Sequence, residues 1–326
     1  MIRLGILGAA RIAKGAIFEP APGQDGISVH SIASRSLSRA EAMAEEWGVP
    51  NIAASYAALI SAPDIDAIYI GLPPSEHREW TLAALAAGKH VLCEKPFAMN
   101  AAEAAEMEEA ARVSGLVLME AFHYRFHPLF QKLIEIVEGG ALGRIRSFHA
   151  QFNVPIRYSD SEFRYDPALG GGALMDLGCY PIHWARTLLG REPRVSAATI
   201  GLHASGVDEF FEATLDFEEG VTGFVTSSMR EDLPRVLDAG LRLTGERGEL
   251  IVDNPLAPQL GNRVIVKAED DETEISIDEG TTYEHQLRHF VDLVNGHVDP
   301  VLPAGDPTAQ MKVLDAIRQF GETSAS

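Results

Sequence analysis

Cysteine is scarce in this sequence, because Cys93 and Cys179 are the only two among its 326 residues. Two cysteines cannot build a disulfide framework or a four-cysteine zinc site, and no cluster of His, Cys and Asp has metal-ligand spacing. Both cysteines lie among apolar residues, as reduced structural thiols do. We therefore expect a cytoplasmic protein that holds no metal.

Positive charge and long apolar runs are also in short supply. Lys and Arg number 27 against 47 Asp and Glu, which leaves a net charge of −20. Such a charge repels a nucleic-acid backbone and an anionic membrane surface. No run reaches the roughly 18 apolar residues that a membrane-spanning helix needs. Neither a nucleic acid nor a membrane is an expected partner.

Length and composition indicate two globular domains. A chain of 326 residues exceeds what one ordinary core covers, and 46% hydrophobic with 23% charged residues is typical of folded proteins. In the first part, strand-like runs alternate with helical patterns of about 10–15 residues, which predicts crossovers building a doubly wound parallel sheet. The expected strands are residues 2–8, 28–34, 65–72, 90–94 and 117–120. The expected helices are residues 11–18, 38–47, 76–87 and 101–114.

The pattern changes after about residue 126. Phe148, Ala150 and Phe152 alternate with polar residues, and further strand-like runs follow through short turns, which predicts a large, mostly antiparallel sheet. We expect an α/β Rossmann domain over residues 1–123 and an α+β domain over residues 124–326. The other strands of the second domain are expected at 195–203, 210–217, 221–229, 237–244, 249–252, 263–267 and 273–277. Its helices are expected at 173–190, 283–295 and 307–322.

A candidate phosphate-binding turn lies where the first expected strand meets the first expected helix. Its sequence, Gly8-Ala9-Ala10-Arg11-Ile12-Ala13, has the pattern Gly-x-Ala-x-x-Ala of a weakened dinucleotide fingerprint. The main-chain N–H groups and the positive dipole end of a helix can hold a phosphate at such a turn. The alternative is a turn whose small residues serve only close packing.

The end of the second expected strand favours NADP over NAD. An NAD site usually has an Asp or Glu here to hold the ribose 2′-hydroxyl, whereas this chain has Ser34 and Arg35. A hydroxyl and a guanidinium can bind a 2′-phosphate, and Arg39 supplies a possible second cation one turn later. The alternative is an arginine that only faces solvent at a strand end.

Two further segments follow expected strands at the carboxyl edge of the parallel sheet, where doubly wound folds bind ligands. The first is the stiff turn Leu72-Pro73-Pro74, followed by His77, which is either a ligand contact or simply a residue of the next helix. The second is Glu94-Lys95-Pro96, which ends a buried strand. Because burying an ammonium in the core is costly, Lys95 must face a cleft or solvent, and the proline holds it at a bend.

A polar stripe marks the helix expected at residues 173–190, which follows Gly170-Gly171-Gly172. Asp176, Tyr180 and His183 fall at i, i+4 and i+7, so a carboxylate, a phenol and an imidazole share one face. The alternative is a solvent-exposed face, but this face has no Lys, Glu or Gln. We interpret the stripe as part of a catalytic site.

Taken in order, these motifs resemble those of the glucose–fructose oxidoreductase, inositol dehydrogenase and rhizopine catabolism (Gfo/Idh/MocA) family, over the whole chain. Within the family the chain is most similar to dimeric dihydrodiol dehydrogenases and NADP-dependent D-xylose dehydrogenases. Many relatives have His at the position of Tyr180 and Trp at that of Phe163, which leaves the substrate open. The motifs are the fingerprint at Gly8, Glu94-Lys95-Pro96, residues 120–128, Phe163-Arg164, the glycine run at residues 170–172, and Asp176-Leu177-Gly178-Cys179-Tyr180.

The resemblance implies a role for each of these residues. Lys95 and Tyr180 would handle the proton, Asp176 would bind substrate, and Arg164 would lie near the nicotinamide. When a carbonyl is reduced, negative charge grows on its oxygen, and an ammonium or a phenol there stabilises the transition state. The expected substrate contacts are Lys95, Tyr124, Phe163, Asp176, Tyr180 and His183. The expected NADP contacts are Gly8, Ala9, Ala10, Arg11, Ile12, Ser34, Arg35, Arg39, Leu72, Pro73, Pro74, His77, Glu94, Lys95, Pro96 and Arg164.

The implied activity is NADP(H)-dependent hydride transfer between nicotinamide and the CH–OH or C=O carbon of a sugar-like or cyclic-diol substrate. One alternative is an aldopyranose 1-dehydrogenase acting on a sugar such as D-xylose. Another, of a different class, is a noncatalytic NADP-bound sensor or partner subunit, although the joint presence of Lys95, Asp176 and Tyr180 argues against it. The sequence leaves open which of Lys95 and Tyr180 transfers the proton. The resemblance also implies a homodimer or a dimer of dimers, paired through the second sheet.

Overall fold

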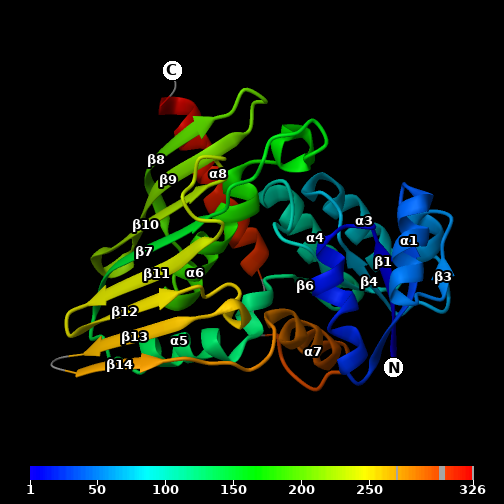
Figure 1. Ribbon diagram of the computed structural model, residues 1–326, viewed down its shortest axis with the longest axis horizontal. Coiled ribbons are helices and arrows are strands. Elements are labelled where there is room, and N and C mark those ends of the chain that lie inside the picture. The colour runs from blue at the N-terminus through cyan, green and yellow to red at the C-terminus, as the bar shows by residue number, and fades with distance from the viewer. Residues whose placement is uncertain (269–270, 301–304, 325–326) are drawn as a thin grey trace. The chain divides into compact units, whose positions relative to one another are not determined.

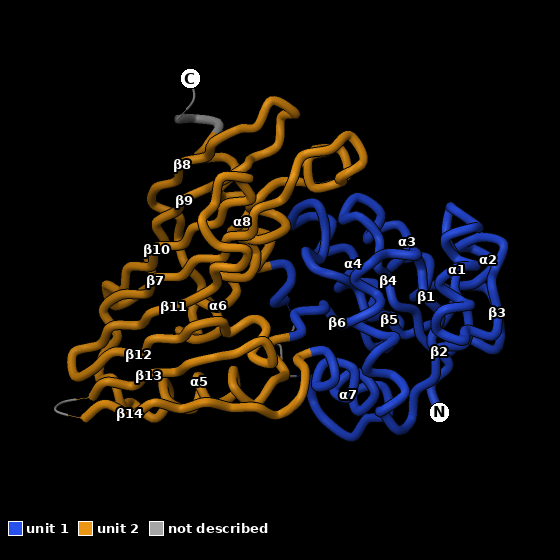
Figure 2. Tube along the Cα trace, viewed as in Figure 1, with its two compact units in different colours: residues 1–123, 283–308 blue, residues 124–282, 309–326 orange. Residues whose placement is uncertain are grey.

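The computed structural model describes residues 1–268, 271–300 and 305–324. The chain forms two compact units, which Figure 2 distinguishes by colour. Unit 1 comprises Met1–His123 and Tyr283–Thr308, and unit 2 comprises Tyr124–Thr282 and Ala309–Ser326. The chain thus leaves unit 1 after residue 123 and returns to it at residue 283, whereas we expected residues 124–326 to form one continuous domain.

Unit 1 is built on a six-stranded sheet in the order β3-β2-β1-β4-β5-β6, whose paired strands are all parallel. The chain order switches between β1 and β4, and doubly wound folds bind ligands beyond the carboxyl ends of the strands at such a point. The expected Rossmann-like architecture is confirmed (Figure 1). The strands are β1 (Ile2–Leu7), β2 (Ile27–Ala33), β3 (Asn51–Ile52), β4 (Ala67–Ile70), β5 (His90–Cys93) and β6 (Leu118–Glu120). The connecting helices are α1 (Leu37–Trp47), α2 (Tyr56–Ile60), α3 (Pro74–Ala86) and α4 (Ala101–Ser114).

The elements of unit 1 follow from local sequence signals. The central strand β4 is buried along its whole length, as its continuous apolar run predicts. Helix α4 begins at Asn100, whose side chain accepts the Glu103 N–H, and ends at Gly115 in a left-handed conformation. The short elements β3 and α2 were not expected, because two and five residues are too few to show a periodic pattern.

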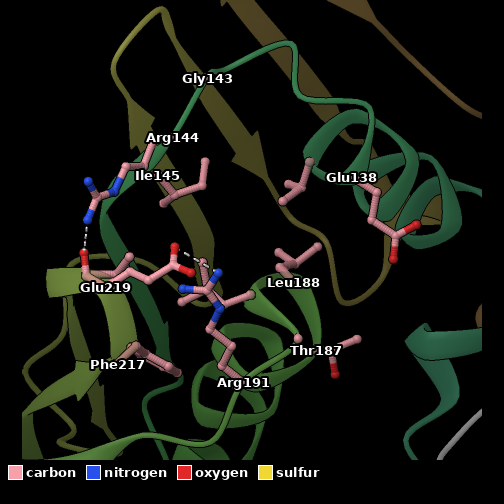
Figure 3. Close-up of a pocket in the computed structure, with 13 residues that line it drawn as sticks. Glu138, Gly143, Arg144, Ile145, Thr187, Leu188, Arg191, Phe217 and Glu219 are labelled. Carbon is pink, nitrogen blue, oxygen red and sulfur yellow. Dashed lines mark hydrogen bonds and ion pairs between the residues drawn. The ribbon is translucent and has the colours of Figure 1, made fainter.

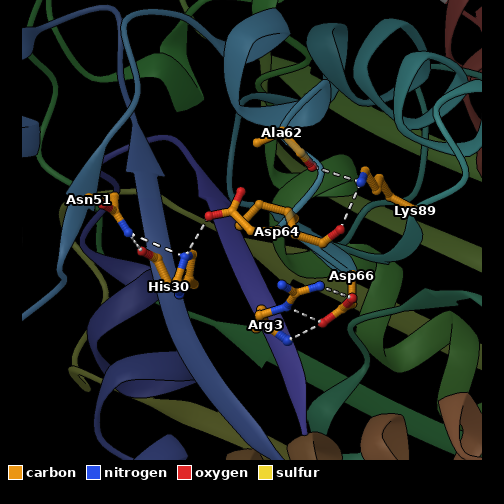
Figure 4. Close-up of polar contacts among 8 residues, drawn as sticks. Arg3, His30, Asn51, Ala62, Asp64, Asp66 and Lys89 are labelled. Atoms are coloured by element: carbon orange, nitrogen blue, oxygen red, sulfur yellow. Dashed lines mark hydrogen bonds and ion pairs between the residues drawn. The ribbon is translucent and has the colours of Figure 1, made fainter.

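Polar contacts tie the strands of this sheet at the end opposite the candidate site (Figure 4). Arg3 donates to both carboxylate oxygens of Asp66 at 2.8–2.9 Å. This pairing lowers the pKa of Asp66 to about 2, mainly through the hydrogen bond from Arg3. The Lys89 ammonium donates to the carbonyl oxygens of Ala62 and Ile65. The amino ends of β1, β4 and β5 are therefore held by side chains, which leaves their carboxyl ends for function.

Helix α7 (Thr282–Val294) is the segment that returns to unit 1. Its residues Leu287, Phe290 and Val291 are buried. A side chain at Gly26, just before β2, would come within 3.2 Å of Val291, so the helix packs closely on that turn. An amphipathic pattern predicts that a helix buries one face but not the unit against which it packs. For that reason we expected this helix in the second domain from the sequence alone.

Unit 2 is built on an eight-stranded sheet in the order β14-β13-β12-β11-β7-β10-β9-β8. Strands β7 and β10 pair in parallel and the other neighbours pair antiparallel, which confirms the expected mostly antiparallel sheet. The strands are β7 (Ile145–Asn153), β8 (Arg194–Leu202), β9 (Asp208–Phe217), β10 (Val221–Ser228), β11 (Asp238–Gly245), β12 (Gly248–Asp253), β13 (Arg263–Ala268) and β14 (Asp271–Ile275).

Helices α5 (Pro128–Glu138), α6 (Cys179–Leu189) and α8 (Asp306–Ser324) lie along one face of this sheet (Figure 1). Helix α6 contacts β7 and β10, and a side chain at Gly321 of α8 would overlap Ile200 of β8. Helix α5 was not expected, although Pro128 at its first turn and the buried Leu129 and Leu133 are ordinary helix signals.

Cys93 and Cys179 are both buried and form no disulfide. Within residues 1–268, 271–300 and 305–324, no helix has the length and apolarity needed to cross a bilayer. The same described residues contain no group of three or more His, Cys, Asp or Glu side chains placed to hold a metal ion.

Candidate active site

The fingerprint turn at the end of β1 is a close approach of three strands. The Gly8 N–H donates to the carbonyl oxygen of Ala33 at the end of β2, at 2.9 Å. Gly8 has a φ of +96°, and a Cβ there would lie 2.7 Å from the carbonyl oxygen of Gly71 after β4. Only glycine fits this position. The helix that follows has a π-helical segment, η1 (Lys14–Phe18).

The two cations assigned to the 2′-phosphate lie in different surroundings. Arg39 donates through Nη2 to the carbonyl oxygen of Ala9 at 2.7 Å, so it braces the fingerprint turn from α1. Arg35 leaves 69% of its side chain exposed and pairs with Glu76 at 3.1 Å. Ser34 accepts the Ser36 N–H through Oγ. Arg35 is therefore the accessible guanidinium at this strand end, whereas Arg39 supports the main chain.

We expected His77 to contact the cofactor, and the structure places its ring between two main-chain carbonyl oxygens. Its ring is fully buried, with Nε2 2.8 Å from the Leu72 carbonyl oxygen and Nδ1 3.0 Å from that of Pro96. Both partners only accept, so the ring donates to one oxygen when neutral and to both when protonated. Burial lowers the pKa of His77. Because main-chain oxygens already occupy both ring nitrogens, His77 spans two rim segments instead of offering a donor to a ligand.

The carboxylate of Glu94 organises the strand end that carries Lys95. Its Oε1 accepts the Tyr69 hydroxyl at 2.8 Å, and its Oε2 accepts the main-chain N–H of Lys95 at 3.2 Å. Burial, followed by the charge of Glu94, raises the pKa of Tyr69 well above its usual value, so this tyrosine remains a donor. The Lys95–Pro96 peptide bond is cis, and Lys95 itself is half-buried.

Two rings that we did not assign to the site lie beside this strand end. The rings of His123 and Tyr283 contact each other at a tilt, with centroids 4.2 Å apart, and Tyr283 also lies close to Gly15 of η1. Burial, with a smaller contribution from the charge of Lys95, lowers the pKa of His123 to about 3. Burial and the charge of Glu94 raise the pKa of Tyr283. Tyr283 lies in the first turn of α7, and no sequence signal connects it with residues so far away along the chain.

In unit 2, the glycine run makes room for main-chain and carboxylate groups. The Gly172 N–H donates to the carbonyl oxygen of Arg164 at 2.9 Å. A Cβ at Gly171 would overlap that same carbonyl group, and a Cβ at Gly172 would overlap the carboxylate of Asp208. Gly172 also has a φ of +115°, which favours glycine. These glycines therefore fix the loop that carries Arg164 against the start of the next helix.

The structure brings Arg164, Phe163 and Asp176 together. Arg164 donates through Nε to Asp176 Oδ2 at 2.6 Å and through Nη1 to Glu162 Oε1 at 2.9 Å. Its guanidinium lies over the Phe163 ring, 4.8 Å from the centroid. Two carboxylates and one aromatic face thus hold the guanidinium, and Arg164 in turn orients the carboxylate of Asp176.

The helix that carries the stripe is not uniformly α-helical. It begins with the π-helical segment η6 (Leu174–Gly178), which contains Asp176 and continues into α6. A π turn holds more residues than an α turn, so the expected i, i+4 alignment of Asp176 with Tyr180 is rotated. The Tyr180 ring is buried and packs edge-on against Phe152 of β7, with centroids 5.3 Å apart.

His183 and Tyr124 contact each other. The Tyr124 hydroxyl forms a hydrogen bond with His183 Nδ1, and Thr187 Oγ1 lies 3.4 Å from the same nitrogen. Both rings are fully buried, and the Tyr124 ring lies 5.9 Å from that of Tyr180. The stripe is therefore buried, which contradicts the solvent-exposed alternative, and this pair supports Tyr180 from one side. A direct contact of either residue with substrate stays a prediction.

Comparison with known proteins agrees with this geometry. A model of the oxidoreductase family with an NAD-binding Rossmann fold matches residues 2–122, and a model of the GFO/IDH/MocA C-terminal domain matches residues 130–251. A D-xylose 1-dehydrogenase (NADP(+)) from Haloferax volcanii is 34% identical over 99% of this chain and 98% of its own. The chain belongs to the GFO/IDH/MocA oxidoreductase family.

Two other members of this family are similar. A mouse trans-1,2-dihydrobenzene-1,2-diol dehydrogenase is 34% identical over 72% of this chain and 70% of its own. The crystal structure of KijD10, a 3-ketoreductase from Actinomadura kijaniata in complex with NADP and TDP-benzene, matches with a TM-score of 0.89 at 30% identity. That match covers 98% of this chain and 97% of the other. The expected family and fold are confirmed.

A separate pocket of about 300 Å³ lies in unit 2 where α5 and α6 end (Figure 3). Arg144 and Arg191 on its wall both contact Glu219, through its carbonyl oxygen and its carboxylate respectively. None of the described residues that line it belongs to the predicted site, but Thr187 on its wall is the residue that approaches His183. This pocket is therefore distinct from the candidate active site.

Removal of the His77 ring tests its role between the two rim segments. We expect His77→Ala to lower the free energy of unfolding by about 2–4 kcal/mol, because it leaves a cavity and removes the donor to a buried carbonyl oxygen. Urea denaturation measures the change. His297→Ala is the control, since the His297 side chain is 67% exposed in the same unit. A loss for His77→Ala no larger than that of the control would contradict this role.

Proposed function

We propose that this protein catalyses NADP(H)-dependent hydride transfer between nicotinamide and a CH–OH or C=O carbon of a sugar-like or cyclic-diol substrate. The observation that carries the proposal is the position of Lys95 at the carboxyl end of β5, beside the Glu94 carboxylate that accepts its main-chain N–H. The named substrates of the relatives, a pentose and a dihydrodiol, support the substrate class.

The residues at the ends of β1 and β2 fit a dinucleotide that carries a 2′-phosphate. The Gly8 turn precedes a helix start, and main-chain N–H groups at the start of a helix can donate hydrogen bonds to a phosphate. Arg35 offers an accessible guanidinium, and Ser34 offers a hydroxyl. Glu76 would share Arg35 with the phosphate. The relative from Haloferax volcanii is named for NADP(+), which supports the same choice.

Cofactor preference tests this part of the proposal. Arg35→Asp should shift preference towards NAD by about 2–4 kcal/mol, because it removes a phosphate clamp and places a carboxylate near the phosphate. Fluorescence titration with NADPH and NADH measures both affinities. Arg112→Asp is the control, because this arginine of α4 is 71% exposed and pairs only within its own helix. Equal affinity of the native protein for both cofactors would contradict the proposed preference for NADP.

Four side chains take part in the proposed reaction. NADP(H), held by the residues at the ends of β1 and β2, would supply the hydride chemistry. Lys95 and Tyr180 hold or accept a proton at the substrate oxygen, where negative charge develops as a carbonyl is reduced. Asp176 accepts a substrate hydroxyl, and Arg164 orients its carboxylate through the 2.6 Å hydrogen bond.

Substitution of the proton-handling pair tests the chemistry. We expect Lys95→Met and Tyr180→Phe each to lower turnover, by roughly 100-fold or more for the lysine, because a donor beside the developing charge is lost. Absorbance of NADPH is followed with a panel of ketoses, aldoses, osones, diketones and cyclic diols. NADPH affinity and thermal stability should stay near those of the native protein. Lys132→Met on the exposed side of α5 is the control.

Two outcomes of this experiment would contradict the assignment. Near-native turnover in both variants, together with loss in Asp176→Asn or His183→Ala, would transfer the proton handling to those residues. A Lys95→Met protein that no longer folds would make Lys95 a structural residue. Tight NADPH binding without turnover of any substrate in the panel would favour the noncatalytic sensor.

A second candidate is an NADP-dependent aldopyranose 1-dehydrogenase. The specific observation in its favour is the similarity to a D-xylose 1-dehydrogenase over 99% of this chain. Oxidation of D-xylose with NADP, at a rate above that of every diol in the panel, would select this candidate.

We further propose a homodimer or a dimer of dimers formed through the face of the large sheet opposite its helices. This face has Phe224 and His149 side by side, with ring centroids 6.1 Å apart, while the alternate residues of β10 are buried. Light scattering at micromolar concentration should give at least twice the chain mass of 35.3 kDa. Phe224→Asp should raise the monomer fraction, because it buries a charge in the interface. A native monomer would refute the assembly.

A further inference from the structure

Asp208 is a residue outside the predicted site that touches the start of the helix carrying Asp176 and Tyr180. It begins β9, and its Oδ2 accepts the main-chain N–H of Leu174 at 2.5 Å. Its other carboxylate oxygen lies in the space that a side chain at residue 172 would occupy. The carboxylate of Asp208 can reach the helix start only because Gly172 has no Cβ. The hydrogen bond to Leu174 therefore depends on both Asp208 and Gly172.

The contact acts on the first turn of η6, where main-chain N–H groups have no acceptor within the helix. Leu174 is two residues before Asp176 and six before Tyr180. The same turn is held from the other side by the Gly172 N–H, which donates to Arg164, and by the side chain of Arg164 on Asp176. A helix start held at both sides transmits its position to the residues that follow.

Asp208 is half-buried, and its carboxyl lies among main-chain N–H groups and one arginine. Burial raises the pKa of its carboxyl to about 7, and the N–H of Leu174 and the charge of Arg318 on α8 oppose that rise. Arg318 is the charged side chain among the described residues that acts on it, and its other partners are main-chain N–H groups of Leu174, Ala173 and Asp208 itself. The carboxyl keeps an acceptor oxygen in either protonation state.

We propose that Asp208 is a positioning residue for the reaction, which fixes the start of η6 and thereby places Asp176 and Tyr180. This inference rests on the proposed function for its catalytic consequence. The structural part, that Asp208 holds η6, is independent of that function and is tested separately.

The test compares Asp208→Ala, which removes the acceptor, with Asp208→Asn, which keeps one acceptor oxygen. We expect kcat/KM for substrate to fall by about tenfold or more in the alanine variant and by less in the asparagine variant, while the KM for NADPH stays within about twofold. Asp216→Asn is the control, because Asp216 is another aspartate of β9 and pairs with Arg194 on the surface. Its kinetics should match those of the native enzyme.

Hydrogen exchange of the peptide covering residues 174–178 gives a readout that needs no turnover. Exchange there should rise by about tenfold in Asp208→Ala and less in Asp208→Asn, with other helices unchanged. Unchanged exchange and kinetics in a folded alanine variant would overturn the proposal, as would an asparagine variant no better than alanine. If the alanine variant does not fold, the asparagine variant decides in the same way. Absence of native turnover would refute the proposed function, while the exchange result would still decide whether Asp208 holds η6.

Discussion

The structure of unit 1 depends on how buried polar groups are satisfied where its parallel strands end. A buried carboxylate or carbonyl that lacks a donor costs free energy, and two such groups at the sheet edge have donors nearby. Glu94 recruits the Tyr69 hydroxyl and the Lys95 N–H, and the ring of His77 bridges the carbonyl oxygens of Leu72 and Pro96. The bend from which Lys95 projects is thus fixed by polar contacts and not by apolar packing alone.

In unit 2, buried polar groups at the start of a helix are satisfied in the same way. Its first N–H groups are taken by an acid from a neighbouring strand, and glycines leave the space for that approach. Arg164 is held by two carboxylates and the face of Phe163, so its own hold on Asp176 is rigid. Side chains that are hydrogen-bonded to neighbouring residues keep the geometry of a site more closely than side chains without such contacts.

The family places this arrangement among enzymes with different named substrates. A pentose dehydrogenase and a dihydrodiol dehydrogenase both align with most of this chain, and a 3-ketoreductase shares its fold. A common fold therefore does not identify the substrate, which depends on the shape and polarity of the side chains that contact it. Phe163 and Tyr180, two of the expected substrate contacts, both belong to unit 2.

The sequence by itself determined the two architectures, the fingerprint turn, the missing acid after β2 and the order of the family's motifs, because all of these are local patterns of period, spacing or residue type. Only the tertiary structure decided which unit α7 joins, that Tyr283 contacts His123, that both nitrogens of His77 face carbonyl oxygens, and that Asp208 reaches Leu174 past Gly172. These contacts join residues far apart along the chain. The periodicity of apolar residues does not predict these contacts, since they form only when the strands and helices pack together.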